Sequence, residues 1–248
     1  MGGDIYVGVG GWTFEPWRGV FYPEGLQHRR ELEYASRALT SIEINGTYYS
    51  SFARESWEKW AEETPDGFVF SVKASRFCTN RKELAGEPAQ ESIRRFFAQG
   101  LAALGPKLGP INWQFMATKK FDPVDFEGFL QRLPREVEGL RLRHALEVRS
   151  PTFCTPEFYD LARKYEAAIV YARDEDFPEI EVRTADFTYA RLMSSREDLP
   201  QGVDAAELAL LTARARDWAK AGDVFAYFIS GAKVRNPAAA RALIAALE

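Results

Sequence analysis

Cysteine and histidine are scarce in this sequence, with two residues of each among 248. Cys78 and Cys154 stand far apart and outside any paired-cysteine motif, which indicates reduced thiols in a reducing compartment rather than a disulfide framework. His28 and His144 have no partner at the spacing that metal ligands require. We therefore predict no metal site, and the sequence makes no cofactor evident.

Long apolar runs and an excess of positive charge are also missing. The first four residues, Met-Gly-Gly-Asp, are not the basic start of a signal peptide, and no segment is apolar enough over its length to span a membrane. We therefore expect a cytoplasmic protein without a membrane partner. The formal net charge of −4 gives no overall basic field, which argues against a nucleic-acid partner. Nothing in the sequence specifies an oligomeric state.

What the chain does contain is an alternation of short β-rich runs and longer amphipathic ones. The strand candidates are residues 5–11, 41–47, 68–74, 110–115, 144–149, 167–173, 187–193 and 224–230. Helical spacing of apolar residues predicts helices over 29–38, 55–63, 90–104, 156–165, 205–219 and 237–247, with Asp204 and Asn236 as caps of the last two. Residues 174–185 look irregular.

Strands that alternate with helices predict a parallel sheet, and eight such units in 248 residues predict an α/β fold, a single TIM-type (β/α)8 barrel domain over residues 1–248. We expect it to be irregular around the sixth βα unit. A doubly wound open sheet is the alternative. Gly8-Val9-Gly10-Gly11 resembles the glycine-rich turn of that fold only weakly, because the third glycine would fall at Thr13.

Charged residues of one parity stand near the carboxyl ends of several predicted strands, where barrel active sites lie. Glu43 and Asn45 share one face of the second strand, as Glu147 and Arg149 share one face of the fifth. We predict Glu43, Glu147 and Lys73 as catalytic groups. Predicted ligand-binding residues at strand ends are Trp12, Asn45, Tyr48, Gln114, Arg149, Tyr171, Arg191 and Tyr227. Loops that often bind phosphate add Ser194, Ser230, Gly231, Lys233 and Asn236.

A plainer interpretation stands beside each of these assignments. The charges form a self-satisfied network inside the barrel, with Glu147 paired to Arg191 and Glu43 to Lys73. Lys73 forms a Schiff base if it is desolvated, or is an ordinary paired lysine. Trp12 and Tyr48 stack on a ligand or simply pack in the wall.

Several segments together resemble the YecE-like family, also called domain of unknown function 72. The segments include Gly8-Val9-Gly10-Gly11-Trp12, Trp17-Arg18-Gly19, Glu43-Ile44-Asn45-Gly46-Thr47-Tyr48-Tyr49, Phe68-Val69-Phe70-Ser71-Val72-Lys73, Lys107-Leu108-Gly109-Pro110, Glu147-Val148-Arg149 and Tyr189-Ala190-Arg191-Leu192. The resemblance covers nearly the whole chain and implies a TIM barrel, but no known activity. The family usually has polar residues, including a His-Gly pair and an Asn-Asn-Asp run, where Met193-Ser194 and Ile229-Ser230-Gly231 stand here.

The sequence therefore predicts an uncharacterised barrel protein that binds a small anionic or phosphorylated metabolite at the carboxyl-end mouth, with carboxylates available for acid/base chemistry. A non-catalytic binding or regulatory barrel is the second hypothesis, because polar groups usual in the family are replaced at Met193, Ile229 and Gly231. A nucleic-acid-associated protein is a weaker third hypothesis, based on the basic residues Arg76, Arg81, Lys82, Lys119 and Lys120.

Overall fold

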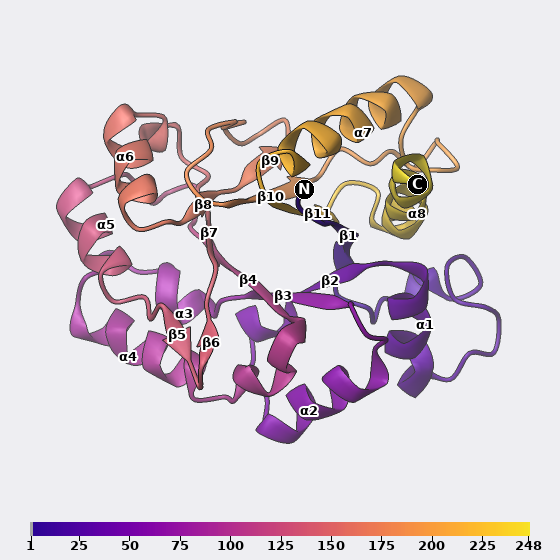
Figure 1. The fold of residues 1–248 in the computed structure, drawn as a ribbon, viewed down its shortest axis with the longest axis horizontal. Coiled ribbons are helices and arrows are strands. Elements are labelled where there is room, and N and C mark those ends of the chain that lie inside the picture. The colour runs from indigo at the N-terminus through magenta and orange to yellow at the C-terminus, as the bar shows by residue number, and fades with distance from the viewer. Residues whose placement is uncertain (1) are drawn as a thin grey trace.

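A ring of parallel strands surrounded by helices forms the protein in a computed structural model, which describes residues 2–248 (Figure 1). The ring contains β1 (Ile5–Gly10), β2 (Ser41–Ile44), β3 (Val69–Lys73), β4 (Leu108–Gln114), β7 (His144–Glu147), β8 (Ala168–Ile169), β9 (Tyr171–Arg173), β10 (Phe187–Leu192) and β11 (Asp223–Phe228). The helices are α1 (Glu31–Ala38), α2 (Arg54–Glu63), α3 (Arg76–Thr79), α4 (Glu87–Phe97), α5 (Pro123–Leu130), α6 (Pro156–Lys164), α7 (Ala205–Ala219) and α8 (Asn236–Leu247). A short hairpin of β5 (Glu136–Val137) and β6 (Leu140–Arg141) lies outside the ring.

Two short strands, β8 and β9, together complete the ring at the sixth of its eight positions. The strand order is β8-β7-β4-β3-β2-β1-β11-β10-β9, and every neighbouring pair is parallel. β8 pairs with β7 and β9 pairs with β10, while only Val170 separates β8 from β9 in the chain. The Val170 amide donates to the Leu146 carbonyl at 3.0 Å, so the two short strands are consecutive pieces of one barrel position. The predicted TIM-type α/β barrel is confirmed.

The irregular sixth unit is confirmed as well. No helix or strand occurs between Arg173 and Phe187, so the helical layer has a gap between α6 and α7. Elsewhere the helices cover the outer face of the strands. The apolar strand residues that point outward are buried beneath them, among them Val9, Ile42 and Phe228. Alternate residues on each strand point inward, and this alternation determines which side chains can meet inside the barrel.

Two predicted helix boundaries are wrong, and one helix was not predicted. The predicted helix over 90–104 ends at Phe97, because Gly100 has a left-handed backbone (φ 87°) and a 3₁₀ segment, Leu101–Lys107, follows it. The missed helix α5 begins at Pro123, and the Asp122 carboxylate accepts two backbone N–H groups at its start. Asn236 does not cap α8; it is the first helical residue, and Arg235 occupies the cap position without a side-chain bond. Asp204 does cap α7, accepting from the Glu207 amide at 2.8 Å.

Candidate functional site

Gly8 lets the backbones of β1 and β2 approach each other closely. A Cβ atom on Gly8 would lie 1.7 Å from the Ser41 carbonyl oxygen, so only glycine permits the observed approach of β1 and β2. Tyr227, on β11, is fully buried, and its hydroxyl lies 2.7 Å from Ser41 Oγ and 2.6 Å from Ser71 Oγ. Tyr227 therefore lies below the mouth, fully buried, and not among the groups that a ligand entering the mouth meets first.

Arg191, on β10 beside Tyr227 of β11, lies at the centre of a buried charge network. Its Nη1 donates to Glu147 Oε2 at 2.7 Å, and its Nη2 donates to Glu43 Oε1 at 3.2 Å. Asn112, on β4, donates from Nδ2 to both carboxylates, at 3.2 Å to Glu43 and 3.1 Å to Glu147. The Tyr189 hydroxyl donates to Glu43 Oε2. Strands β2, β4, β7 and β10 thus meet through one arginine.

The two glutamates are fully occupied by these donors. Arg149 adds two bonds to Glu147 Oε1, from Nε at 2.9 Å and from Nη2 at 2.7 Å, so all four carboxylate oxygens accept hydrogen bonds. Burial alone would raise the pKa of Glu147, but Arg191, then Arg149 and Lys73, outweigh burial and lower that pKa to about 2. A carboxylate with this pKa stays ionised at neutral pH and is a poor general base.

Lys73, at the carboxyl end of β3, is the charged residue that this network leaves without a partner. Its ammonium forms no ion pair and no hydrogen bond among residues 2–248, although the side chain is only 8% exposed. Its Nζ lies over the Tyr48 ring, 4.4 Å from the ring centroid. Burial, followed by the charge of Arg191, lowers the pKa of Lys73 to about 8. The pair of Glu43 with Lys73 considered from the sequence does not form, because Glu43 bonds to Arg191 instead.

The cluster carries one positive charge in excess when Lys73 is protonated. Two carboxylates, Glu43 and Glu147, are matched by the two guanidinium groups of Arg149 and Arg191, and the Lys73 ammonium remains. Gln114 completes the cluster, accepting from Arg149 Nη2 at 3.0 Å. An uncompensated, largely desolvated cation is costly unless an anion approaches it.

A hollow of about 410 Å³ lies at the ends of β1 and β2. Trp12, Asn45, Tyr49, Trp60 and Lys233 are among the residues that line it. Two of the lining residues are neighbours of the cluster: Asn45, directly after β2, donates from Nδ2 to the Glu43 carbonyl at 3.4 Å, and the Tyr49 ring contacts the Tyr48 ring, with centroids 5.0 Å apart. Aromatic walls with a few polar groups are typical of small-molecule sites.

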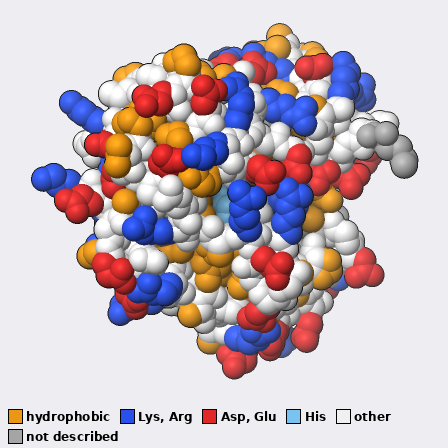
Figure 2. Space-filling model, turned by 60° about the vertical axis from the view of Figure 1, so that its left-hand side comes forward, with side chains coloured by type: hydrophobic (Ala, Val, Ile, Leu, Met, Phe, Trp, Pro, Cys, Tyr) orange, Lys and Arg blue, Asp and Glu red, His pale blue; other side chains and the backbone are white. Residues whose placement is uncertain are grey.

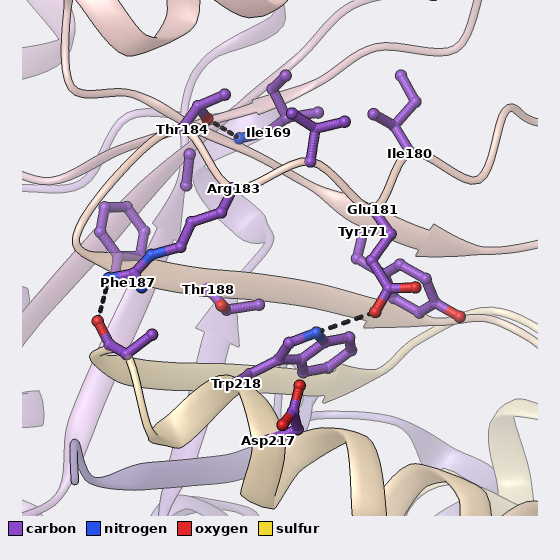
Figure 3. Close-up of a pocket in the computed structure, with 13 residues that line it drawn as sticks. Ile169, Tyr171, Ile180, Glu181, Arg183, Thr184, Phe187, Thr188, Asp217 and Trp218 are labelled. Carbon is purple, nitrogen blue, oxygen red and sulfur yellow. Dashed lines mark hydrogen bonds between the residues drawn. The ribbon is translucent and has the colours of Figure 1, made fainter.

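Tyr171 faces outward from the barrel, away from the interior that holds the charged cluster. Its side chain points toward the helical layer, into a cavity of about 270 Å³ at the place where the sixth βα unit has no helix. Figure 3 shows Tyr171 beside Trp218, whose indole N–H donates to Glu181 at 3.1 Å. The Tyr171 hydroxyl donates to Glu179 at 2.9 Å. Val170 points into the barrel, and Tyr171, the next residue, therefore points outward. Tyr171 is thus separate from the cluster around Arg191.

The loops after β10 and β11 are joined through Asn236. Its Oδ1 accepts from Ser195 Oγ at 2.6 Å, and its Nδ2 donates to the Ser230 carbonyl at 3.1 Å. The Asn236 side chain is thus buried and used within the protein, whereas Ser194, Ser230, Gly231 and Lys233 remain exposed at the rim. Ser230 and Gly231 both have left-handed backbone (φ 60° and 52°), a conformation that costs free energy for serine.

Sequence reasoning missed Asn112 and Tyr189, the two neutral members of the network. Strand parity could have identified both residues, because Asn112 shares the inner face of β4 with Gln114, and Tyr189 shares that of β10 with Arg191. Among residues 2–248 no group of three or more His, Cys, Asp or Glu side chains is arranged to hold a metal ion. None of the helices between residues 2 and 248 has both the length and the apolar composition needed to cross a membrane.

Comparisons with known proteins agree with this fold. The family described as "Protein of unknown function DUF72" matches residues 6–248. UPF0759 protein YunF of Bacillus subtilis (strain 168) is 26% identical over 161 residues, 63% of this chain and 54% of that relative, so the match spans about half of the relative's length. A DUF72 family protein from Thermotoga maritima MSB8 has a TM-score of 0.77 at 23% identity, over 97% of each chain. Another, from Enterococcus faecalis V583, has a TM-score of 0.72 at 15% identity, over 99% of each chain.

Proposed function

The chain belongs to the DUF72 family, whose description includes no activity, and from that premise we propose that its barrel mouth binds a small anionic or phosphorylated metabolite. The anionic group contacts Lys73 and Arg149. The remainder of the molecule lies in the hollow lined by Trp12, Asn45 and Tyr49. A mouth at the carboxyl ends of the strands is the usual location of ligand sites in this fold.

The observation that carries the proposal is the unpaired Lys73 ammonium in a cluster with one excess positive charge. Arg149 supports the same ligand class because its side chain is 21% exposed and its Nη1 donates to no group among residues 2–248. An anion at this place would gain two charge-assisted contacts and would neutralise a charge that is expensive to bury.

Glu43 and Glu147 have a supporting role in this proposal. Their oxygens are occupied by Arg191, Arg149, Asn112 and Tyr189, and the lowered pKa of Glu147 opposes proton transfer at neutral pH. They position the guanidinium groups and hold the barrel layers together. The same observation favours a binding barrel over an enzyme that uses these two glutamates as acid and base.

The nucleic-acid hypothesis receives less support. Lys119 is bonded to Asp125 at 2.7 Å and to the Lys82 carbonyl at 2.7 Å, and Arg81 donates to Ser92 and to the Phe77 carbonyl. Figure 2 shows lysine and arginine side chains interspersed with acidic ones over the face that it draws, rather than gathered in one region. Backbone binding to nucleic acid requires clustered positive charge.

Calorimetric titration with inorganic phosphate tests the proposal. We expect saturable binding to the natural protein, and at least a roughly tenfold weaker affinity for Lys73→Met, because one charge-assisted contact is lost. Lys220→Met is the matched control: Lys220 is 76% exposed at the end of α7 and is paired with Asp217, away from the mouth. Equal affinity of the natural protein and Lys73→Met, or an equal loss in Lys220→Met, contradicts the proposal.

A further inference from the structure

We propose that Lys73 forms an imine with the carbonyl carbon of a small aldehyde or ketone that carries a carboxylate or phosphate group. The inference rests on the proposed anion site, because the same cluster holds the charged end of the ligand. It goes further by assigning a covalent step and a substrate class, the anionic oxo compounds.

The first support is the position of the Lys73 amine. The backbone of Lys73 is fixed, since the Thr47 hydroxyl donates to its carbonyl and the next amide, that of Ala74, donates to the Asn112 carbonyl at 2.9 Å. The side chain is 8% exposed, and Nζ rests over the Tyr48 ring at 4.4 Å. No carboxylate or carbonyl among residues 2–248 accepts a hydrogen bond from Nζ, so no direct partner holds Lys73 in its ammonium form. Once deprotonated, the amine has a lone pair that can attack a carbonyl group.

The second support is the set of charges around the amine. Arg191 from β10 and Arg149, which follows β7, disfavour an ammonium at this place, whereas Glu43 from β2 and Glu147 from β7 favour it. The Tyr48 ring packs against it from the turn after β2. Burial is the largest influence, and the resulting pKa of Lys73 is about 8. At pH 7.5 roughly a quarter of Lys73 is then neutral, against roughly one in a thousand for an ordinary lysine.

The third support is the neighbouring anion anchor. Arg149 packs over the Phe177 ring at 4.4 Å, and its guanidinium is held by Glu147 and Gln114. Its free Nη1 is a fixed donor for a carboxylate or phosphate oxygen. With the charged end of the ligand bound there, a carbonyl group elsewhere in the same molecule can reach Lys73, which converts a bimolecular addition into a reaction within one complex.

The covalent step needs no oxidant or reductant. The neutral Lys73 nitrogen adds its lone pair to the carbonyl carbon, and the π pair moves to the carbonyl oxygen, which takes a proton from the solvent. The carbinolamine then loses its hydroxyl group with a further proton as one water molecule, and a C=N bond replaces C=O. The nitrogen releases two protons, one when the carbinolamine forms and one when the C=N bond forms. These balance the two protons that the oxygen takes up, so amine and carbonyl compound give imine and water.

Reductive trapping tests the inference. The natural protein is incubated with pyruvate or with glyceraldehyde 3-phosphate in the presence of cyanoborohydride, and the modified lysines are identified by peptide mass spectrometry. We expect modification at Lys73 at least roughly tenfold faster than at any other lysine, because its neutral fraction is far larger. Excess inorganic phosphate should slow this labelling, and neutral glyceraldehyde should label Lys73 more slowly than its phosphate. The pyruvate and sugar-phosphate arms distinguish a carboxylate-bearing substrate from a phosphate-bearing one.

The outcomes separate this inference from the proposed function. Labelling that is spread evenly over exposed lysines such as Lys59 and Lys220, or that is unchanged in total for Lys73→Met, overturns the imine. If phosphate still binds in calorimetry in a Lys73-dependent way, the anion site stands and only the imine is wrong. The competition by phosphate uses the natural protein alone, so the test does not depend on the variant folding.

Discussion

The Lys73 ammonium lies 4.4 Å from the centre of the Tyr48 ring, and no carboxylate among residues 2–248 pairs with it. Two carboxylates are within electrostatic reach, but both are occupied by Arg191 and its neighbours. Both carboxylates of the cluster are therefore paired with arginines, and the positive charge of Lys73 has no paired carboxylate. This relationship is the basis of the proposed anion site.

Glu147→Gln should destabilise the protein strongly. The substitution leaves Arg191 and Arg149 buried or half-buried with one carboxylate fewer, and removal of one partner from a buried ion pair costs about 3–5 kcal/mol. The free energy of unfolding in urea measures the effect. Glu58→Gln is the matched control, because Glu58 pairs with Arg54 at the surface and its loss should change stability by less than about 1 kcal/mol. Similar small losses for both variants would contradict the central position of Glu147.

Mild acid should destabilise the protein through His144. Burial lowers the pKa of His144 to about 4, and its ring is held between Trp113 Nε1 and the Pro134 carbonyl. The unfolded chain takes up this proton near pH 6.5 and the folded chain only near pH 4, so stability falls as pH decreases through this window, by up to roughly 3 kcal/mol. Urea unfolding at several pH values measures the slope. The slope should persist in His28→Gln and diminish in His144→Gln; an unchanged slope in His144→Gln would refute the assignment.

Lys73→Met should stabilise the protein near neutral pH while it weakens anion binding. The folded-state pKa of Lys73 is about 8 against an ordinary value of 10.5, so the unfolded chain binds more protons between these values and stability rises with pH across them. A neutral methionine of similar length removes the buried charge, and we expect a gain of about 1–3 kcal/mol at pH 7. Thermal unfolding of both proteins at pH 7 and pH 10 should show the gap closing at the higher pH. A variant that is less stable at pH 7 would indicate that Lys73 has a partner.

Much of the fold was predictable because the strands obey simple alternation. All eight predicted strands occur, and the inner parity of Glu43, Lys73, Gln114, Glu147, Arg149 and Arg191 brings these residues into one cluster. Periodicity does not, however, specify which cation each carboxylate binds. The choice of Arg191 over Lys73 for Glu43 depends on where the side chains end in three dimensions, and a planar guanidinium can bridge two carboxylates where an ammonium cannot.

Other parts were not predictable, for local reasons. Tyr171 was assigned to the mouth because it stands near the end of the sixth strand, but the residue parity there points it at Trp218 and the helical layer. Asn236 is of a residue type that often caps helices, yet its side chain joins two loops. It bonds to Ser195, 41 residues earlier in the chain, and to Ser230, 6 residues earlier. Asn112 and Tyr189 were missed because uncharged residues in an apolar strand give no strong signal on their own.

The most direct test of the account is a pH titration of the Lys73 amine by nuclear magnetic resonance. Lysines are dimethylated with ¹³C-labelled formaldehyde, and the signal of Lys73 is assigned by its absence in Lys73→Arg. We predict a titration midpoint near pH 8 for Lys73, well below those of exposed lysines such as Lys59, and an upward shift when inorganic phosphate is added. A midpoint for Lys73 that equals those of the exposed lysines, with no response to phosphate, would contradict the claim that Lys73 is a buried, unpaired cation that binds an anion at the barrel mouth.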